Sequence, residues 1–244
     1  MPSLPRSHRI VGRWVPSAGA TGFRLVDRVR SNHGTLTGMD PTSDWVVNGG
    51  KGALDFDGSN DFVFAPIPNL SGIKATLSAW VRGVPGSGST GYIVSAPKDS
   101  AGSNGIDFRS PSNVIFDVVM QSGLVALTSG VDIRGSWNHL CGGCDGTRVF
   151  FFVNGTLVAS QANTGTLDTA YTSSEINLGR FGSFGAFAAC QIDDVTIYNT
   201  GLTANEAREI YRLGRGYGVF PEPDFDEGFA AAFNRRRRVL LTAG

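Results

Sequence analysis

The chain has 244 residues, a formal net charge of zero and only 17% charged residues, and 33 of its residues are glycine. This length can bury one large core, and a glycine-rich, charge-poor composition favours strands joined by tight turns over helices. The first residues lack the apolar core of a secretory signal, and no apolar run approaches the roughly 20 residues that span a bilayer, so we expect no signal peptide, no transmembrane segment and no membrane partner.

The number of cysteines indicates in which cellular compartment the chain is assembled. They are Cys141, Cys144 and Cys190. Three cysteines cannot all pair within one chain, which argues against a disulfide-built secreted module and for assembly inside a cell. Cys141 and Cys144 have the spacing of a redox site, but such sites begin a helix and this segment is predicted as strand and turn, so we expect buried thiols.

Residues 10–39 open the chain without helical periodicity, because proline and glycine interrupt the pattern. They contain Trp14 and the block Asn-His-Gly-Thr-Leu at positions 32–36. No second histidine or carboxylate lies at metal-binding spacing from His33, so we interpret His33 as structural.

Residues 53–64 (ALDFDGSNDFVF) predict a β-hairpin with one buried face around an Asp-Gly-Ser-Asn turn at positions 57–60. The apolar residues expected on that face are Leu54, Phe56, Phe62 and Phe64. Residues 76–82 (TLSAWVR) alternate in the same way and predict the next strand, in which we expect Trp80 to be a core or sheet-face aromatic.

Residues 86–91 (GSGSTG) match a lone G-x-G-x-x-G pattern, but a dinucleotide site needs a helix to follow, and Tyr92 to Ala96 indicates a strand. We therefore expect a surface loop there. The short apolar runs at 105–108, 114–120 and 124–127 have the spacing of a β-meander in the same sheet.

Residues 137–160 (WNHLCGGCDGTRVFFFVNGTLVAS) predict three consecutive antiparallel strands. Asn154-Gly155 tolerates the positive φ angles of a type I′ hairpin turn, and apolar residues flank it on both sides. Asp145-Gly146 supplies turn chemistry for the reversal before it.

The remaining elements are a polar loop at 163–174, strands at 176–180 and 187–198, and one helix. Thr203 and Glu206 have the spacing of a capping box at the start of this helix. We expect the helix to run to about Leu213 and to stop at Gly214.

These blocks, in this order, resemble the laminin-G-like domains of the concanavalin A type. The resembling blocks are the Trp14 strand with Asn-His-Gly-Thr-Leu, Phe-Asp-Gly, TLSAWVR, Trp-x-His with the Val-Asn-Gly hairpin, INLGR, and Ile-Asp-Asp near position 193. The resemblance implies an all-β fold: an antiparallel jelly-roll β-sandwich over residues 10–213 with one short C-terminal helix and extended arms at 1–9 and 214–244. One departure is that Ala189 and Cys190 occupy the region where the family has a glycine.

The resemblance also implies calcium as the one cofactor to consider, because many of these domains bind it through loop carboxylates and carbonyl oxygens. The implied ligands are Asp57, Asp61, Asp193 and Asp194. Aspartates also stabilise turns without a metal, so both interpretations stay open.

The sequence contains no known arrangement of catalytic residues. Glycosidases need two carboxylates that face each other across a cleft, roughly 5 to 10 Å apart. Asp55 and Asp57 flank a turn, and the adjacent Asp193 and Asp194 would point to opposite faces of a strand. No H-E-x-x-H, G-x-S-x-G or Walker pattern is present. We therefore predict a protein that is not an enzyme.

The arginine-rich start with VPSAGATG, the NHGTLTGMDP block and the C-terminal arginine run resemble stand-alone laminin-G-like proteins of tailed bacteriophages and some aquatic bacteria. This resemblance implies a virion structural protein, either a capsid decoration or a tail-associated subunit, that forms homo-oligomers and grips other virion proteins. It would be made in the host cytoplasm and located in the virion. The partner-binding residues would be Phe220, Phe225, Phe229, Phe233, Arg235, Arg236, Arg237 and Arg238.

The alternative is a carbohydrate-binding or adhesion module that recognises cell-surface or environmental glycans. A sugar site is expected on a sheet face or a rim loop that offers exposed aromatic and polar groups. Trp45, Tyr92 and Tyr171 are the candidates. Four arginines at 235–238 could also contact phosphates, but no other nucleic-acid motif accompanies them, so we do not expect a nucleic-acid partner.

Overall fold

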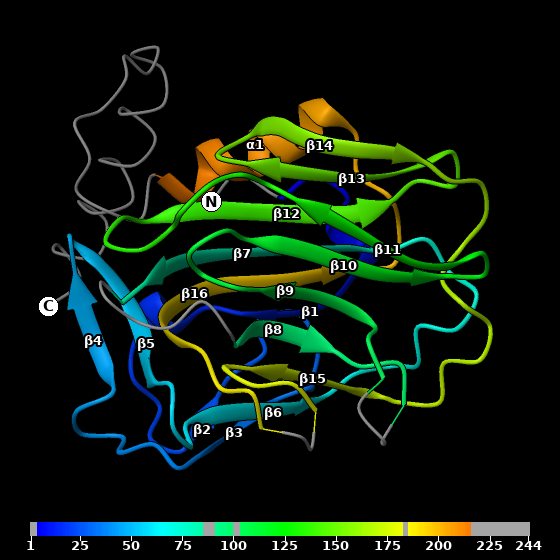
Figure 1. Cartoon of the computed structure of the whole chain (residues 1–244). Coiled ribbons are helices and arrows are strands. Elements are labelled where there is room, and N and C mark those ends of the chain that lie inside the picture. Colours follow the sequence, from blue (N-terminus) through cyan, green and yellow to red (C-terminus); the bar gives the residue numbers. More distant parts are fainter. Residues whose placement is uncertain (1–3, 85–90, 100–102, 183–184, 216–244) are drawn as a thin grey trace, which may run out of the picture.

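The computed structural model describes residues 4–84, 91–99, 103–182 and 185–215, which form two antiparallel β-sheets that face each other (Figure 1). Sheet A has the order β14-β13-β12-β7-β16-β5-β4 with β1 paired to β16, and sheet B has the order β11-β10-β9-β8-β15-β6-β3-β2. The predicted all-β sandwich with one C-terminal helix is confirmed.

The strands of sheet A are β1 (Ile10–Trp14), β4 (Trp45–Asn48), β5 (Lys51–Asp57), β7 (Thr76–Gly83), β12 (Asn138–Cys144), β13 (Arg148–Val153), β14 (Thr156–Ala162) and β16 (Ala189–Tyr198). Those of sheet B are β2 (Arg24–Leu25), β3 (Gly34–Thr37), β6 (Phe62–Pro66), β8 (Tyr92–Ala96), β9 (Ile106–Arg109), β10 (Ile115–Met120), β11 (Gly123–Thr128) and β15 (Glu175–Leu178). Two 3₁₀ turns, η1 (Ser7–Arg9) and η2 (Pro16–Ala18), and the helix α1 (Ala204–Arg215) complete the described elements.

The core lies between the sheets and follows from alternation along the strands. In β7, Leu77 and Val81 are fully buried in this core. Phe108 and Phe116 of sheet B pack on Phe151 of sheet A. The ring centroids are 5.5 Å apart for Phe108 and Phe116, 5.7 Å for Phe108 and Phe151, and 5.8 Å for Phe116 and Phe151. Burying each such ring stabilises the fold by about 2 to 3 kcal/mol.

The three consecutive strands predicted at 137–160 are confirmed as β12, β13 and β14, which pair antiparallel in this order. Asn154 and Gly155 have φ angles of 53° and 73°, as a type I′ turn requires. The Asp145 carboxylate holds the preceding turn by accepting the backbone N–H groups of Thr147 at 2.9 Å and Arg148 at 3.0 Å. The predicted meander is also confirmed, since β8, β9, β10 and β11 pair in sequence.

The predicted hairpin at 53–64 is wrong. β5 pairs with β4 and β16 in sheet A, whereas β6 pairs with β3 and β15 in sheet B. The turn at 57–60 therefore carries the chain from one sheet to the other. Val63 and Ala65 are the core residues of β6, and Phe64 is 37% exposed on the outside. Both faces of β6 are apolar, so alternation alone did not show which face is buried.

A β-bulge interrupts β16. Its register against β7 shifts between Asp193 and Thr196, and the extra residue Asp194 has a φ angle of 46°, which aspartate tolerates better than most residues. Ile192 and Val195 both lie in the core, so Asp193 and Asp194 both face outward from sheet A. The expectation that these two aspartates point to opposite faces is wrong, because it assumed a regular strand.

Helix α1 packs on the outer face of sheet A beside β13 and β14 (Figure 1). Its capping box is confirmed: Glu206 N donates to Thr203 Oγ1 at 3.3 Å, and Thr203 N donates to Glu206 Oε2 at 2.8 Å. Gly214 lies inside the helix instead of ending it. A Cβ at Gly214 would lie 2.0 Å from Trp80 Nε1, so the glycine permits close packing of helix on sheet.

The N-terminal segment differs from the extended arm that we expected for residues 1–9. Leu4 packs against the cluster between α1 and sheet A, and Arg6 Nε donates to Glu206 Oε1 at 2.6 Å. Residues 4–9 therefore contact the body of the same chain. Residues 214 and 215 of the predicted C-terminal arm belong to α1, and the rest of that arm, with its phenylalanines and the arginines at 235–238, lies outside the described residues. Within the described part, no helix is both long enough and apolar enough to cross a bilayer.

Candidate functional site

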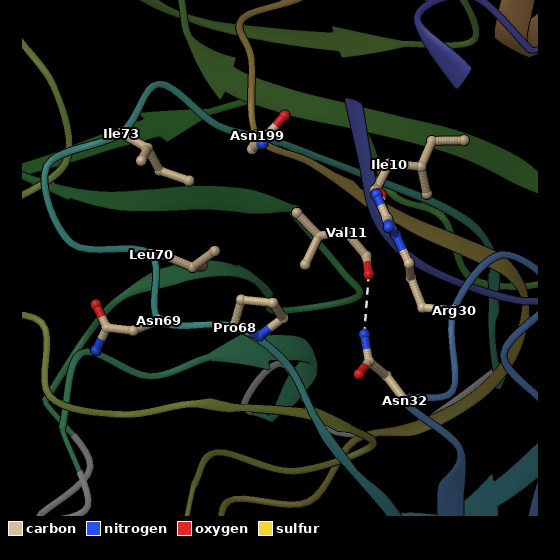
Figure 2. A pocket seen from close by; sticks show the side chains of 9 residues that line it. All are labelled: Ile10, Val11, Arg30, Asn32, Pro68, Asn69, Leu70, Ile73 and Asn199. Atoms are coloured by element: carbon tan, nitrogen blue, oxygen red, sulfur yellow. Dashed lines mark hydrogen bonds between the residues drawn. The ribbon is translucent and has the colours of Figure 1, made fainter. Parts of the chain in front are cut away.

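A pocket of about 370 Å³ opens beside the start of β1, the loop before β3 and the loop between β6 and β7 (Figure 2). Its lining residues are Ile10, Val11, Arg30, Asn32, Pro68, Asn69, Leu70, Ile73 and Asn199. The volume lies within the range of roughly 300 to 1,000 Å³ that is typical of small-molecule sites. Apolar side chains lie beside amide and guanidinium groups on both sides of the pocket, a mixed lining that suits a small ligand with apolar surface and several hydroxyl groups.

Asp27 fixes the loop that carries two polar residues of this pocket, Arg30 and Asn32. Its side chain is buried, and Oδ1 accepts the backbone N–H groups of Arg13 and Val29, both at 3.0 Å. Oδ2 accepts the N–H of Asn32 at 3.2 Å. Three backbone donors on one carboxylate hold the loop against β1, so Arg30 and Asn32 have a defined position before any ligand arrives.

Two asparagines join the pocket walls to neighbouring strands and loops. Asn32 Nδ2 donates to Val11 O at 2.9 Å, and Asn32 O accepts the indole N–H of Trp14 at 2.8 Å. Asn69 Nδ2 donates to Tyr171 O at 2.9 Å and to Ser173 O at 3.1 Å. These bonds connect segments far apart in the chain, and no described residue donates a hydrogen bond to Asn32 Oδ1.

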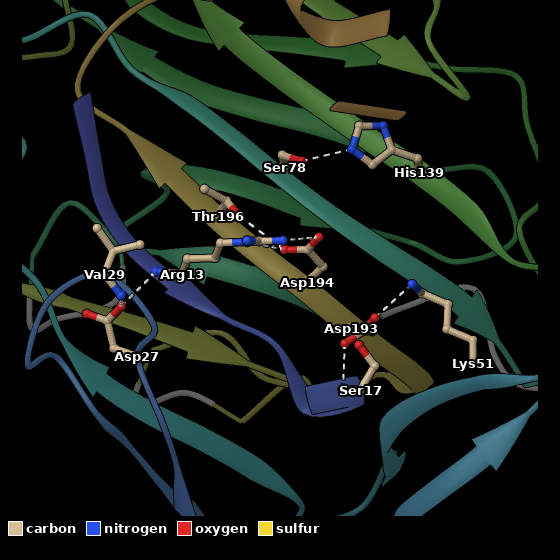
Figure 3. A network of polar contacts seen from close by, with 10 residues as sticks. All are labelled: Arg13, Ser17, Asp27, Val29, Lys51, Ser78, His139, Asp193, Asp194 and Thr196. Carbon is tan, nitrogen blue, oxygen red and sulfur yellow. Dashed lines mark hydrogen bonds and ion pairs between the residues drawn. The ribbon is translucent and has the colours of Figure 1, made fainter. Parts of the chain in front are cut away.

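A second polar group, on the outer face of sheet A, contains two of the predicted calcium ligands (Figure 3). Asp193 is paired with Lys51 at 2.7 Å, and both side chains are 1% exposed. Arg13 binds both carboxylate oxygens of Asp194, at 2.7 and 2.8 Å. Protein cations already neutralise both aspartates, so this pair does not fit a calcium ion.

The other two predicted calcium ligands serve the turn after β5. Asp57 Oδ1 accepts the backbone N–H groups of Ser59 at 2.7 Å and Asn60 at 3.3 Å, and Asp61 Oδ2 accepts the N–H of Asp57 at 3.1 Å. Burial raises the pKa of Asp61. Among the described residues, no three histidine, cysteine, aspartate or glutamate side chains converge to hold a metal ion. Calcium stays a prediction without a contact that supports it.

The histidine and cysteines of β12 are buried. Ser78 Oγ lies 2.9 Å from His139 Nε2, and burial lowers the pKa of His139 to about 4. Burial raises the pKa of Cys141 to about 12 and also raises that of Cys144 and Cys190. All three thiols are free and buried, as predicted from the strand placement of the Cys-Gly-Gly-Cys segment. Thiols held protonated in this way are poor nucleophiles.

The outer face of sheet B contains a carboxylate pair that the sequence analysis missed. Asp107 of β9 and Asp117 of β10 are opposite each other in register, and both are fully buried. Asp117 is paired with Arg109, whereas burial raises the pKa of Asp107 to about 7. The two carboxyl groups therefore differ in their environments, since Asp117 has a cationic partner and Asp107 has a raised pKa. Both are completely buried, so a sugar chain cannot reach them.

None of the three predicted sugar-binding aromatics lines the pocket, although the backbone oxygen of Tyr171 accepts a hydrogen bond from the lining residue Asn69. Trp45 is half-buried on β4 and its Nε1 donates to Gly22 O at 3.1 Å. Tyr92 on β8 stacks on Phe181 with a centroid distance of 4.1 Å. Tyr171 is a core residue, only 4% exposed, so we drop it from the candidates.

The pocket residues themselves escaped the sequence analysis. Arg30 is one of several arginines near the N-terminus, and Asn69 and Asn199 lie in segments without a motif. Only the position of Asn32 inside the Asn-His-Gly-Thr-Leu block pointed to this part of the fold. The pocket joins residues from four separate stretches of the chain, which no local pattern can predict.

The two facing antiparallel sheets define a concanavalin A-like β-sandwich domain. Residues 57–208 match the family model Laminin_G_3, described as the concanavalin A-like lectin/glucanases superfamily, and the chain belongs to this family. The resemblance seen in the sequence is thereby confirmed at the level of the family. Among curated proteins, none matches this sequence significantly.

Solved structures agree on the fold. The binding domain of Paraclostridial Mosquitocidal Protein 1 has a TM-score of 0.65 at 14% identity, covering 85% of this chain and 53% of that one. The botulinum neurotoxin serotype G binding domain has a TM-score of 0.63 at 16% sequence identity, and the match covers 84% of this chain and 51% of that one. The botulinum neurotoxin serotype D ligand binding domain, solved in complex with N-acetylneuraminic acid, has a TM-score of 0.63 at 12% sequence identity. That match covers 85% of this chain and 51% of the other.

The present chain thus spans about half the length of these solved chains. At such low identity the similarity shows the fold alone. Neither the family match nor these structures support an origin in a bacteriophage, so the virion role stays a prediction.

Proposed function

We propose that this protein is a carbohydrate-binding module that holds a sugar in the pocket of Figure 2. The observation that carries the proposal is the pocket itself: about 370 Å³, with apolar residues such as Leu70 and Ile73 beside amide and guanidinium groups. A sugar ring has C–H groups that pack on apolar side chains and hydroxyl groups that need directed hydrogen bonds. The lectin/glucanase family supports the same class of ligand.

We propose binding without catalysis at this site. The described residues that line the pocket include no carboxylate, histidine, cysteine or hydroxyl side chain. A glycosidase needs an acid and a base or nucleophile beside the scissile bond. The lining therefore supports a lectin-like role over a glucanase-like one.

A pocket-blocking variant tests the proposal. Asn199 is an exposed residue of the lining, so Asn199→Trp should fill the pocket and leave the core unchanged. Leu124→Trp, on the 52% exposed Leu124 of β11, is the matched control for adding an aromatic surface group. We expect the wild type and the control to bind at least one saccharide on a glycan array, and Asn199→Trp to lose that binding.

Two results would contradict the proposal. If no saccharide binds the wild type, the module is not carbohydrate-binding. If Asn199→Trp binds as well as the wild type, the sugar site is elsewhere on the domain. Saturation-transfer NMR on a hit from the array would show whether the ligand contacts the protein at all.

A further inference from the structure

Arg30 is the one charged residue among those that line the pocket. Its guanidinium makes a single long hydrogen bond in the described part of the chain, from Nε to Ile10 O at 3.4 Å. Figure 2 shows the side chain at the edge of the pocket, next to Ile10. The two terminal nitrogens have no hydrogen bond or ion pair with the described residues. An arginine remains charged at neutral pH, so the pocket carries an uncompensated positive charge.

We infer that the pocket takes a sugar acid and that Arg30 binds its carboxylate; this inference rests on the proposed carbohydrate binding. The planar guanidinium fork matches a carboxylate with two parallel hydrogen bonds, and such charge-assisted pairs are stronger than neutral ones. A neutral sugar would use the apolar wall and the amides but leave the cation unpaired. A uronic acid or a sialic acid would contact the apolar residues, the amide groups and the guanidinium of Arg30.

Arg30 is exposed, and Arg13 shows a contrasting state. Arg13 lies on β1, two residues after the lining residue Val11, and its guanidinium binds both carboxylate oxygens of Asp194. The nearest acid on the loop of Arg30 is Asp27, whose oxygens accept three backbone N–H groups instead. Asp27 thus holds Arg30 in place without neutralising it, which leaves the charge for a ligand.

The same loop supplies a matched control. Arg28 is an exposed arginine two positions before Arg30, and it is absent from the pocket lining. Its backbone N–H donates to Arg13 O at 2.8 Å, a bond that a side-chain substitution keeps. Arg28→Gln and Arg30→Gln therefore remove the same charge from the same loop, and only the second removes it from the pocket.

The test measures the affinity of the full chain for D-glucuronic acid, N-acetylneuraminic acid, glucose and the methyl ester of glucuronic acid by titration calorimetry or ligand-detected NMR. We expect at least one acid to bind about ten-fold or more tightly than its neutral counterpart. Arg30→Gln should remove most of this preference, because it should weaken binding of the acid far more than binding of the neutral sugars. Arg28→Gln should keep the preference, and Arg30→Lys should keep part of it, because the charge remains while the fork is lost.

The outcomes separate this inference from the proposed function. If neutral sugars bind as well as the acids, or if Arg30→Gln binds the acid as tightly as wild type does, the acid assignment falls and carbohydrate binding stands. If glucose 6-sulfate binds more tightly than glucuronic acid, the carboxylate assignment is wrong. If none of the sugars binds and the glycan array is also empty, both the inference and the proposed function fail.

Discussion

The buried carboxyl group of Asp107 makes the stability of this domain depend on pH in a direction opposite to that of most acidic residues. Burial raises its pKa from 3.8 to about 7. Between those values the folded chain keeps a proton that the unfolded chain has lost, so the free energy of unfolding falls as pH rises. The contribution is fully present below about pH 4 and is lost above about pH 7, at about 1.4 kcal/mol per pH unit.

Asp107→Asn removes this titration and keeps the shape of the side chain, including an oxygen for the Gly105 N–H that now donates to Oδ2 at 2.8 Å. We expect the variant to match the wild type at about pH 4.5 and to be more stable by about 3 kcal/mol at about pH 8. Urea unfolding at several pH values measures the difference. Taking the difference is essential, because His139, whose pKa is lowered to about 4, changes stability in the opposite direction over nearly the same range.

The exposed Asp40, whose pKa is lowered by the Thr42 N–H, supplies the control. Asp40→Asn should give a constant difference from the wild type above about pH 4.5, because Asp40 stays ionised throughout. If Asp107→Asn also gives a constant difference, the carboxyl group is ionised at neutral pH. The account of burial beside Asp117 would then be wrong.

Three further changes test other parts of the fold, each by urea unfolding. Lys51→Met should cost about 3 to 5 kcal/mol because Asp193 would stay buried without its partner, and adding Asp193→Leu should recover most of the loss; no recovery would refute the pairing. Gly214→Ala should cost roughly 1 to 3 kcal/mol, with a changed tryptophan fluorescence, because the new Cβ would press on Trp80. Thr203→Ala should cost about 1 kcal/mol through the lost cap, and an unchanged midpoint would contradict the capping role.

The sequence predicted best where local chemistry determines the structure. Asn154-Gly155 forms its turn because both residues accept positive φ angles, whatever the rest of the chain does. The turn at 57–60 shows the limit. The same residues can return a chain within a sheet or pass it to the facing sheet, and the choice depends on which of two apolar faces of β6 finds the core. That choice is set by long-range packing, which the local pattern does not contain.

The bulge in β16 and the pocket were beyond prediction for a related reason. Two consecutive aspartates give no sign that the second one adopts a φ angle of 46°. The extra residue matters because it turns Asp194 toward Arg13, and that pair fixes β1 beside β16. The pocket in turn depends on where β1 lies, since Val11 forms part of its wall. A local irregularity far along the chain thus helps to place a site near its start.

The same contacts explain why a ligand site is expected at the edge of the sandwich and not on a sheet face. Helix α1 and the ion pairs of Lys51 and Arg13 occupy the outer face of sheet A. On sheet B, Asp117 forms an ion pair with Arg109 and is fully buried beside Asp107. The edge pocket differs, because there Arg30 keeps donors without a described partner while its loop is anchored through the backbone. We therefore propose that substitutions at Arg30 change which ligand binds and leave the fold unchanged, since no core contact and no ion pair of the described chain depends on its side chain.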